Sequence, residues 1–309
     1  MPPSLREAAY VRAVAPVLSA PALRRKLADY LLLAKPRLSL LVLATAVVGF
    51  WLASGVAAET ARLLVFAAGT FFVIGGANAL NQIVEREQDK LMARTRRRPL
   101  PSGRMEPKEA WVVAAVLTLG GLGLIAFGTN ALTMALGASA VVTYAAGYTL
   151  LKRRTEWSTW VGALAGALPP LMGWAAARNE VSLPALALFA IVFVWQFPHT
   201  WAIAWLYRED YERAGYRVLP LMDRAGYRTR IHAAGASVAL LAASLSPIFL
   251  GMVGPAYLAG ALALDALLIV LSLRFAFGRT RRAAGYLLAA SLIYLPLLMA
   301  LLVMDRRSF

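Results

Sequence analysis

Three oxygen-bearing side chains recur every four residues near the end of an apolar stretch. Asn81, Glu85 and Asp89 occupy positions i, i+4 and i+8, and side chains four residues apart lie on one face of a helix. If the helix continues through them, they form a column over two turns, here called the acid column. Mg²⁺ takes one or two carboxylates together with substrate phosphates and water. The spacing predicts a magnesium site, although acids four apart also occur on ordinary exposed helices.

A strongly basic segment follows the acid column within a few residues. It includes Arg94 and Arg98 and runs to Arg104. Guanidinium groups match phosphate oxygens with two parallel hydrogen bonds. Lys152, at the end of a later apolar stretch, could reach the same anion. An acidic column beside an arginine loop is the combination that a magnesium–diphosphate site needs. The plainer alternative is that these arginines follow a membrane span and only set its orientation in the membrane.

A second cluster of polar residues follows another apolar stretch. Asp210 stands between Tyr207 and Tyr211, and it is the best acid of this cluster for a site. Both clusters follow even-numbered apolar stretches, so both are expected on the same side of a membrane. We therefore expect them to line one cavity mouth.

Ionisable residues also occur inside the apolar stretches, where they are costly and often functional. His199 follows Pro198, so it either takes part in the site or satisfies backbone carbonyls that the proline frees. Asp265 either pairs with another buried polar group or marks a cavity wall. Pro169 and Pro170 are expected to break the helix that contains them, because proline lacks a backbone donor.

The elements that must position these residues are membrane helices. Of 309 residues 60% are hydrophobic and 16% charged, which excludes an ordinary soluble enzyme. No cysteine and two histidines exclude disulfides, Fe–S clusters and thiolate or histidine-rich metal sites. A membrane helix needs about 20 mostly apolar residues. Nine such stretches are predicted, at residues 38–58, 63–84, 110–127, 131–151, 160–177, 183–206, 231–250, 256–273 and 283–304.

The basic residues support this count and orient the chain. With nine spans, 28 of the 32 Lys and Arg residues fall on one side, which the positive-inside rule makes cytoplasmic. The N-terminus is then cytoplasmic and the C-terminus lies across the membrane. The net charge of +16 is explained by topology and requires no nucleic acid. Residues 1–37 are expected to form a cytoplasmic basic arm, with a transit peptide as the alternative, and residues 38–309 a single nine-helix domain.

These motifs together resemble the UbiA superfamily of membrane prenyltransferases. Asn81, Glu85 and Asp89 carry the superfamily resemblance. The rest of the pattern is similar to the protoheme IX farnesyltransferase (heme O synthase) branch. That resemblance covers nearly the whole chain, from about residue 31, and rests on Lys35-Pro36-Arg37, Met92-Ala93-Arg94-Thr95, Arg98-Pro99-Leu100, Phe197-Pro198-His199, Asp210-Tyr211, Ala214-Gly215 and Leu219-Pro220.

The resemblance implies a helical bundle in the cell inner membrane, around a central cavity open to the cytoplasm. It implies a Mg²⁺-dependent transferase with farnesyl diphosphate and protoheme IX as substrates, and a downstream heme-modifying enzyme or oxidase assembly partner. Asn81, Glu85, Asp89 and Asp210 would hold the metal–diphosphate group, with Tyr207 or Tyr211 as hydrogen-bond donors. The basic residues Lys35, Arg37, Arg94, Arg98 and Lys152 would bind substrate, and His199 would orient or ligate heme.

The second cluster departs from the wider superfamily. The superfamily motif has aspartates four and eight residues before the glycine, but counting back from Gly215 those places hold Tyr211 and Tyr207. This argues against 4-hydroxybenzoate or chlorophyll prenylation. Two alternatives remain open from sequence: a UbiA-type prenyltransferase with a quinone or lipid acceptor, and a secondary transporter, whose broken helices and buried charges are similar.

Overall fold

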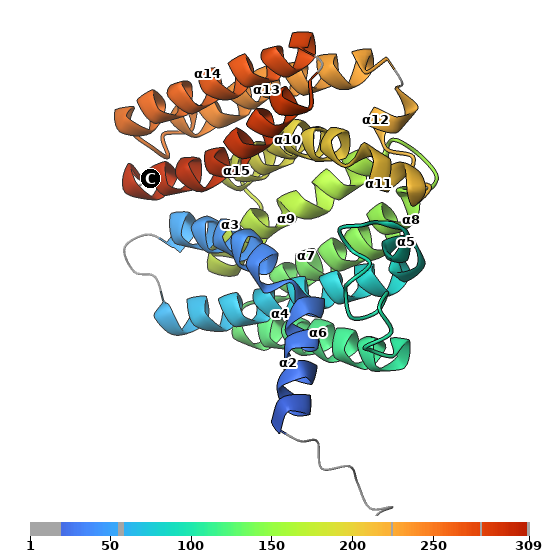
Figure 1. Cartoon of the computed structure of the whole chain (residues 1–309). Coiled ribbons are helices and arrows are strands. Elements are labelled where there is room, and N and C mark those ends of the chain that lie inside the picture. The colour runs from blue at the N-terminus through green and yellow to red at the C-terminus, as the bar shows by residue number, and fades with distance from the viewer. Residues whose placement is uncertain (1–19, 55–58, 224, 279, 308–309) are drawn as a thin grey trace, which may run out of the picture.

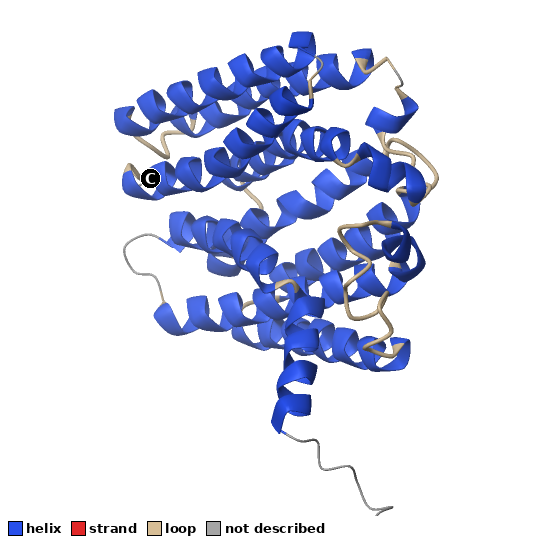
Figure 2. Cartoon of the chain, viewed as in Figure 1, coloured by secondary structure: helices blue, strands red, loops and turns tan. Residues whose placement is uncertain are grey.

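The computed structural model describes residues 20–54, 59–223, 225–278 and 280–307, with side chains described from residue 23 onward. All its regular elements are helices, joined by loops (Figure 2). They are α2 (Ala20–Ala34), α3 (Pro36–Ser54), α4 (Thr60–Val84), α5 (Arg86–Leu91), α6 (Pro107–Gly128), α7 (Ala131–Val142), the π-helix η2 (Thr143–Tyr148), α8 (Thr149–Leu151), α9 (Ser158–Arg178), α10 (Leu183–Leu206), α11 (Arg208–Arg213), α12 (Leu219–Met222), α13 (Tyr227–Phe249), α14 (Pro255–Gly278) and α15 (Arg281–Met304).

The described part of the chain holds nine helices long and apolar enough to cross a membrane. They are α3, α4, α6, the continuous run from α7 through α8, α9, α10, α13, α14 and α15. The prediction of an all-α membrane protein with nine spans is therefore confirmed. The helix ends shift by a few residues from those predicted, as expected for boundaries read from apolar composition alone.

Small residues allow α3 and α9 to pack closely at the centre of the bundle. A Cβ atom at Gly173 would overlap the carbonyl oxygen of Ala46, and one at Gly49 would overlap that of Pro170. Close approach of small residues is a usual way to join membrane helices, because apolar burial gives no advantage over lipid. The two backbones therefore touch directly, and α9 forms a rigid wall beside α3.

The expected break in α9 does not occur. The helix runs unbroken from Ser158 to Arg178 with both Pro169 and Pro170 inside it. Each proline removes one backbone donor, which leaves the carbonyls of Ala165 and Gly166 without their usual helical partners. Both residues line an internal cavity, where a membrane protein tolerates unpaired backbone groups. The prediction was wrong because the neighbouring helices hold α9 in shape.

The short helices gather at one end of the bundle. Figure 1 shows α5, α8, α11 and α12 at the same end, while the described C-terminal end of the chain lies at the other. We call the first of these the site end. The two predicted polar clusters lie there because α4 and α10 both finish at this end and continue into α5 and α11.

Helix α2 runs steeply across the direction of α4 and α6 (Figure 1). Lys26 and Tyr30 both donate to Glu109 at the start of α6, each over 2.6 Å, and Asp29 pairs with Arg104 at 3.0 Å. The described part of the predicted basic arm is thus docked on the bundle. Residues 1–19 lie outside the described residues, so the division into an arm and a domain stays a prediction.

Candidate active site

The acid column forms across a break between two helices. Helix α4 ends at Val84 and α5 begins at Arg86, with Glu85 between them. The backbone N–H groups of Glu85 and Asp89 still donate to the carbonyls four residues earlier, over 2.9 and 2.8 Å. Asn81, Glu85 and Asp89 therefore share one face, as their spacing predicts, and all three are buried at 3%, 5% and 0% exposure.

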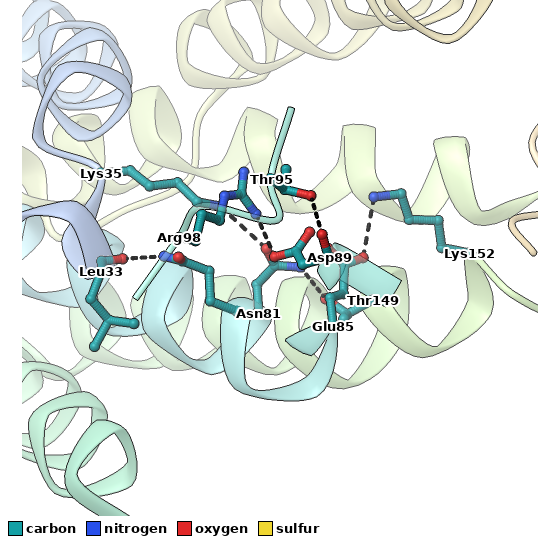
Figure 3. A network of polar contacts seen from close by, with 10 residues as sticks. Leu33, Lys35, Asn81, Glu85, Asp89, Thr95, Arg98, Thr149 and Lys152 are labelled. Atoms are coloured by element: carbon teal, nitrogen blue, oxygen red, sulfur yellow. Dashed lines mark hydrogen bonds and ion pairs between the residues drawn. The ribbon is translucent and has the colours of Figure 1, made fainter. Parts of the chain in front are cut away.

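Three basic side chains contact the acid column, one at each level (Figure 3). Lys35 donates to the amide oxygen of Asn81 over 3.2 Å. Lys152 pairs with Glu85 at 3.1 Å, and Arg98 pairs with Asp89 at 2.7 Å. The structure thus brings together six of the residues that the sequence predicts for the site. They come from α4, α5, the turn before α3, the arginine loop and the end of α8.

One oxygen of the column is buried without a partner. The second carboxylate oxygen of Asp89, Oδ1, has no hydrogen-bond partner in the described structure. Burying an unpartnered carboxylate oxygen is costly. In the described part of the chain, no group of three or more acidic or histidine side chains lies close enough together to hold a metal ion. A hard cation bound here would be coordinated by two carboxylates, the Asn81 amide oxygen and substrate oxygens. This is the donor set that suits Mg²⁺.

The charges of this site depend on one another. Burial alone would raise the pKa of Glu85, but the positive charges of Lys152 and Lys35 hold it below its usual value. Burial disfavours the charged form of Lys152, yet Glu85 and the surrounding tyrosines raise its pKa well above the ordinary value. Burial, reinforced by the charge of Arg98, lowers the pKa of Lys35 to about 7. The Glu85–Lys152 pair is therefore fully ionised at neutral pH.

Lys35 stands at a left-handed turn between α2 and α3. Its φ angle is 49°, a conformation that residues other than glycine seldom adopt. Asn78 and Gln82 hold this turn, because their side-chain amides donate to the carbonyls of Ala34 and Leu33 over 3.4 and 2.6 Å. Such strained positions cluster at functional sites, and this one directs the Lys35 ammonium to the acid column.

An aromatic cage surrounds the Lys152 ammonium. The centres of the Tyr148, Tyr211 and Tyr216 rings lie 5.2, 5.5 and 4.4 Å from it. Tyrosine faces attract cations, most strongly when water is excluded. Tyr211 was predicted as a site residue, whereas Tyr148 and Tyr216 were missed. The spacing of Tyr144, Tyr148 and Lys152, again four apart, is the sequence signal that could have found Tyr148.

A chain of hydrogen bonds joins the acid column to the π-helix η2. Asn81 donates to the Thr149 hydroxyl over 3.2 Å, and Thr149 donates to the carbonyl of Tyr144 over 2.8 Å. Tyr144 stacks on Tyr148 with ring centres 5.5 Å apart. Short π-helical segments are frequent at functional sites. Here the segment stacks Tyr144 on Tyr148, whose ring centre lies 5.2 Å from the Lys152 ammonium.

The second cluster holds the arginine loop rather than completing the acid column. Asp210 accepts a hydrogen bond from the backbone N–H of Ala93 over 3.2 Å and pairs with Arg213. These contacts keep the pKa of Asp210 below its usual value although burial acts in the opposite direction. Arg94 lies over the Tyr207 ring at 5.2 Å. In the described structure Asp210 contacts the loop backbone and Arg213 rather than the acid column, and its place in the four-residue metal set stays a prediction.

Of the other predicted residues, Arg37 is exposed and forms no hydrogen bond or ion pair with the acid column in the described structure. His199 is held in place by its neighbours. His199 stacks on Trp195 with ring centres 4.6 Å apart, and its Nδ1 lies 2.9 Å from the Ser291 hydroxyl. The same hydroxyl lies 2.8 Å from the carbonyl of Leu288; when it donates there, it accepts from Nδ1–H. The pattern leaves Nε2 with a free lone pair.

Asp265 lies away from this site. Its two oxygens accept hydrogen bonds from Ser244 over 2.5 Å and from Tyr294 over 2.7 Å. The first of the two predicted alternatives therefore holds: Asp265 pairs with buried polar groups and joins α13, α14 and α15.

An apolar cavity of about 200 Å³ lies among α3, α4, α7 with η2, and α9, near the acid column. We call it the tail cavity. Its upper wall includes Tyr144 and Asn78, the latter one turn before Asn81. A second apolar hollow, of about 390 Å³, lies between α3 and α15 beside Trp195. A charged, basic site thus stands at the mouth of a cavity suited to a hydrocarbon tail.

Comparison with known proteins agrees with this geometry. The UbiA prenyltransferase family matches residues 42–295. A protein from Solibacter usitatus named protoheme IX farnesyltransferase is 41% identical over 90% of this chain and 98% of its own length. One of the same name from Myxococcus xanthus is 44% identical over 90% of this chain and 94% of its own.

Solved structures show the same fold. A UbiA homologue from Archaeoglobus fulgidus, bound to GPP and Mg²⁺, superposes with a TM-score of 0.65 at 17% identity, over 89% of this chain and 99% of the homologue. At that identity the likeness establishes the architecture alone. The family match and the two relatives establish more, because they span most of this chain: it belongs to the UbiA prenyltransferase family.

Proposed function

We propose that this protein transfers the farnesyl group of farnesyl diphosphate to a vinyl group of protoheme IX, giving heme O and diphosphate. The observation that carries the proposal is the buried acid column, paired with three basic side chains, at the mouth of the tail cavity. The substrate pair follows the names of the relatives from Solibacter usitatus and Myxococcus xanthus.

The basic residues bind the diphosphate. Arg98 and Lys152 are paired with Asp89 and Glu85 in the described structure, so each already lies where an anion would contact it. Arg98 presents a planar fork that matches phosphate oxygens, and Lys152 supplies a compact charge. Lys35 contributes a third cation from the left-handed turn. Together they stabilise the negative charge that grows on the leaving group.

Mg²⁺ fits the residues present. Asn81, Glu85 and Asp89 would hold it, and the unpartnered Oδ1 of Asp89 would gain the partner that it lacks. The homologue from Archaeoglobus fulgidus binds Mg²⁺ together with GPP. When bound, the ion supplies Lewis-acid assistance to departure of the diphosphate.

The acceptor lies on the side of α10 that carries His199. Its Nε2 lone pair can ligate the heme iron, because Ser291 holds the proton on Nδ1. Trp195, stacked on the imidazole, fixes the plane of that ring. This arrangement would orient the macrocycle so that one vinyl group faces the tail cavity, which meets α10 at Gln196.

Farnesyl transfer proceeds by departure of diphosphate, attack of the vinyl group and addition of water. The bond between farnesyl C1 and the diphosphate oxygen breaks, and the electron pair leaves with diphosphate. The vinyl group forms a new carbon–carbon bond to C1, which places a positive charge on the carbon next to the porphyrin. Water adds to that carbon and loses a proton, giving a hydroxyethylfarnesyl group. The apolar tail cavity protects the farnesyl cation from premature capture by water.

We further propose that the protein spans the cell inner membrane with its site end in the cytoplasm. The support is that 28 of 32 basic residues fall on one side in the nine-span arrangement, as the positive-inside rule requires. The N-terminus is then cytoplasmic and the C-terminus lies opposite. A heme-modifying enzyme or oxidase assembly factor would receive the product.

A product assay tests the function. Membranes containing the protein receive heme, farnesyl diphosphate and Mg²⁺, and extracted hemes are weighed by mass spectrometry. We expect a heme heavier by farnesyl plus water, absent when EDTA is present. Asp89→Asn should abolish it, whereas Glu87→Gln, which alters an exposed acid of the same helix, should not. His199→Ala should reduce heme binding, with His232→Ala as its matched control.

The assay also separates the alternatives. If farnesyl diphosphate is consumed in a Mg²⁺-dependent way but no heavier heme appears, the acceptor is a quinone or lipid. If folded protein neither consumes the diphosphate nor modifies heme, prenyl transfer itself is wrong and transport becomes the better hypothesis.

A further inference from the structure

Two arginines lie near each other at the end of the bundle that carries the described C-terminal residues, opposite the site end (Figure 1). Arg178 is the last residue of α9, and Arg306 follows the end of α15 by two residues. The Nε of Arg178 donates to the carbonyl of Ala53, near the end of α3, over 2.8 Å. Burial and then the charge of Arg178 lower the pKa of Arg306, so the two guanidinium groups repel each other.

Membrane orientation does not explain these two arginines. The nine-span arrangement leaves only four of the 32 Lys and Arg residues on this side, and the positive-inside rule favours the other side. Among the described residues, neither guanidinium forms an ion pair. The neighbouring Asp305 is turned to the backbone N–H of Tyr257, from which it accepts over 2.7 Å. The two positive charges therefore have no counter-ion in the described structure.

Arg306 is firmly held, yet one of its donors has no acceptor. Its backbone forms a β-bridge with Val253, and the N–H of Gly254 donates to the carbonyl of Asp305 over 3.0 Å. The side-chain Nε of Arg306 is buried without a hydrogen-bond partner in the described structure. Leaving such a donor unpaired is costly. An anion that offers oxygen acceptors at this point would remove the cost and supply the missing negative charge.

The apolar hollow between α3 and α15 begins beside these arginines and leads toward Trp195. On α15 its lining runs from Leu292 to Met304, two residues before Arg306, which corresponds to about 18 Å at 1.5 Å per residue. Half of the hydrocarbon core of a bilayer is about 15 Å thick. Leu41, Leu292 and Met304 line the hollow and are exposed. The hollow therefore opens to the outside of the bundle and is as deep as one leaflet.

The lining of the hollow suits a hydrocarbon chain. Its polar side chains are Thr45 and Trp195, and all its other lining residues are aliphatic, methionine or proline. Thr45 already donates to the carbonyl of Val42 over 2.7 Å, and Trp195 Nε1 to that of Ser291 over 2.8 Å. A bound alkyl chain would thus leave no polar group of the lining unsatisfied.

We infer that the two arginines and this hollow together bind one phospholipid from the leaflet opposite the site end. Its phosphate lies between Arg178 and Arg306, and one acyl chain lies between α3 and α15 with its end toward Trp195. Guanidinium groups bind phosphate through charge-assisted hydrogen bonds, and basic pockets between membrane helices bind lipid headgroups. The chain then fills the hollow beside the residue that stacks on His199.

Heme does not fit the two arginines while His199 ligates its iron. Ser291, whose hydroxyl contacts His199, precedes Met304 on α15 by a stretch that corresponds to about 20 Å, and Arg306 lies beyond it. A heme is shorter than this from its iron to its carboxylates. An extended acyl chain can cover that length, because it runs along the hollow from a headgroup at the membrane surface.

The first experiment counts lipids on the purified full-length protein. Native mass spectrometry follows the titration of phosphatidylglycerol into delipidated protein in detergent, and we expect one tightly bound lipid per protein. Arg306→Gln should weaken this lipid about tenfold or more, because a charge-assisted hydrogen bond to phosphate is lost. Arg307→Gln removes the exposed charge of the next residue and should have little effect.

A second pair of variants tests the hollow without changing charge. Ala300→Phe adds bulk inside the hollow from an exposed position on α15 and should also lose the tight lipid. Ala263→Phe adds the same bulk at an exposed position on α14, outside the hollow, and should keep it.

Thermal unfolding gives an independent measurement. Phosphatidylglycerol at 100 times its Kd should raise the Tm of the unaltered protein by about 5 °C, and that of Arg306→Gln much less. Without lipid, Arg306→Gln should be no less stable than the unaltered protein, because it removes an unpaired buried donor. A purely structural role of Arg306 predicts the opposite.

Three outcomes would overturn the inference. If the unaltered protein retains phosphatidylglycerol no more tightly than Arg306→Gln and Ala300→Phe do, there is no such site. If inorganic phosphate at the same concentration raises the Tm equally, the arginines bind a free anion and the hollow plays no part. If heme displaces the lipid one for one, the hollow belongs to the acceptor. Prenyl transfer is untouched by all three, because the product assay tests it separately.

Discussion

The buried pair between Glu85 and Lys152 should respond very differently to removal of each partner. Both side chains are almost inaccessible, at 6% and 9% exposure, and their charged atoms lie 3.1 Å apart. Lys152→Met leaves the Glu85 charge buried, with Lys35 as its remaining nearby cation. Glu85→Gln leaves Lys152 inside the cage of Tyr148, Tyr211 and Tyr216, which still stabilises a cation.

The magnitudes follow from this asymmetry. Removing one partner of a buried ion pair typically destabilises a protein by about 3–5 kcal/mol, and we expect Lys152→Met to fall in that range. Each tyrosine face is worth about 0.5–2 kcal/mol to a desolvated cation, so Glu85→Gln should destabilise by only about 1–2 kcal/mol. The double variant should be less destabilised than the sum of the two by about 1–3 kcal/mol.

The assay is reversible unfolding in mixed detergent micelles at neutral pH, followed by far-UV circular dichroism. A matched cycle on the exposed pair Glu87–Lys90 serves as control and should show little coupling. Equal destabilisation by the two single changes would refute the role given to the tyrosine cage. Additive effects at Glu85 and Lys152 would refute the ion pair itself.

The pH dependence provides an independent check on Glu85. In the unaltered protein its pKa is below the ordinary value because Lys152 and Lys35 outweigh the opposing effect of burial. Its contribution to stability is therefore present above the unfolded pKa and lost as pH falls through the folded one. Without Lys152, burial should dominate and raise the pKa. The Lys152→Met variant should then regain stability relative to the unaltered protein as the pH falls from 8 toward 5.

Three further changes test other parts of the site. Tyr144→Leu should lower kcat about tenfold, whereas Tyr144→Phe should keep it, because an aromatic face stabilises a passing allylic cation by about 1–2 kcal/mol. This is measured by single-turnover product formation. Asp210→Asn should raise KM for farnesyl diphosphate about threefold to tenfold with little change in kcat, because the hydrogen bond that the Ala93 N–H donates loses its charge assistance. Steady-state kinetics measure both constants. If Ser291 sets the tautomer of His199, Ser291→Ala should make the Soret change on heme addition weaker and broader. Ser291→Thr, which keeps the hydroxyl, should give the same Soret change as the unaltered protein.

The membrane architecture and the acid column were predictable because both depend on local periodicity. Nine apolar stretches of sufficient length appear directly in the sequence. The four-residue spacing of Asn81, Glu85 and Asp89 survives the break at Glu85, since the backbone hydrogen bonds on both sides of the break keep helical register. The same rule would have revealed Tyr148 from its spacing with Lys152.

The pairings within the site were not predictable, because they join distant parts of the chain. Lys152 and Glu85 are separated by 67 residues, and Asp210 and Ala93 by 117. No local pattern shows that Asp210 turns toward a backbone N–H rather than toward the acid column. The expected break at Pro169 failed for a similar reason: a local rule was overridden by packing against α3.

The balance of charge at the acid column limits how many metal ions it can take. A bound diphosphate favours the protonated form of Lys35, so that in the complex Lys35, Arg98 and Lys152 contribute three positive charges, and Glu85 and Asp89 two negative ones. The protein groups of the occupied site are then positive by one. Farnesyl diphosphate brings about three negative charges at neutral pH. A single Mg²⁺ then leaves the buried site neutral, whereas a second would leave two uncompensated positive charges in a poorly solvated region, which is unfavourable.

The position of Asp210 supports the same conclusion, because the acid that could neutralise a second ion is engaged by Ala93 and Arg213. We therefore expect one divalent ion per protein in the complex with a non-hydrolysable farnesyl diphosphate analogue. Titration with Mn²⁺ followed by electron paramagnetic resonance measures this number. Two tightly bound ions would show that Asp210 leaves the loop when substrate binds, and that the arginine loop is held by the ligand rather than by the protein alone.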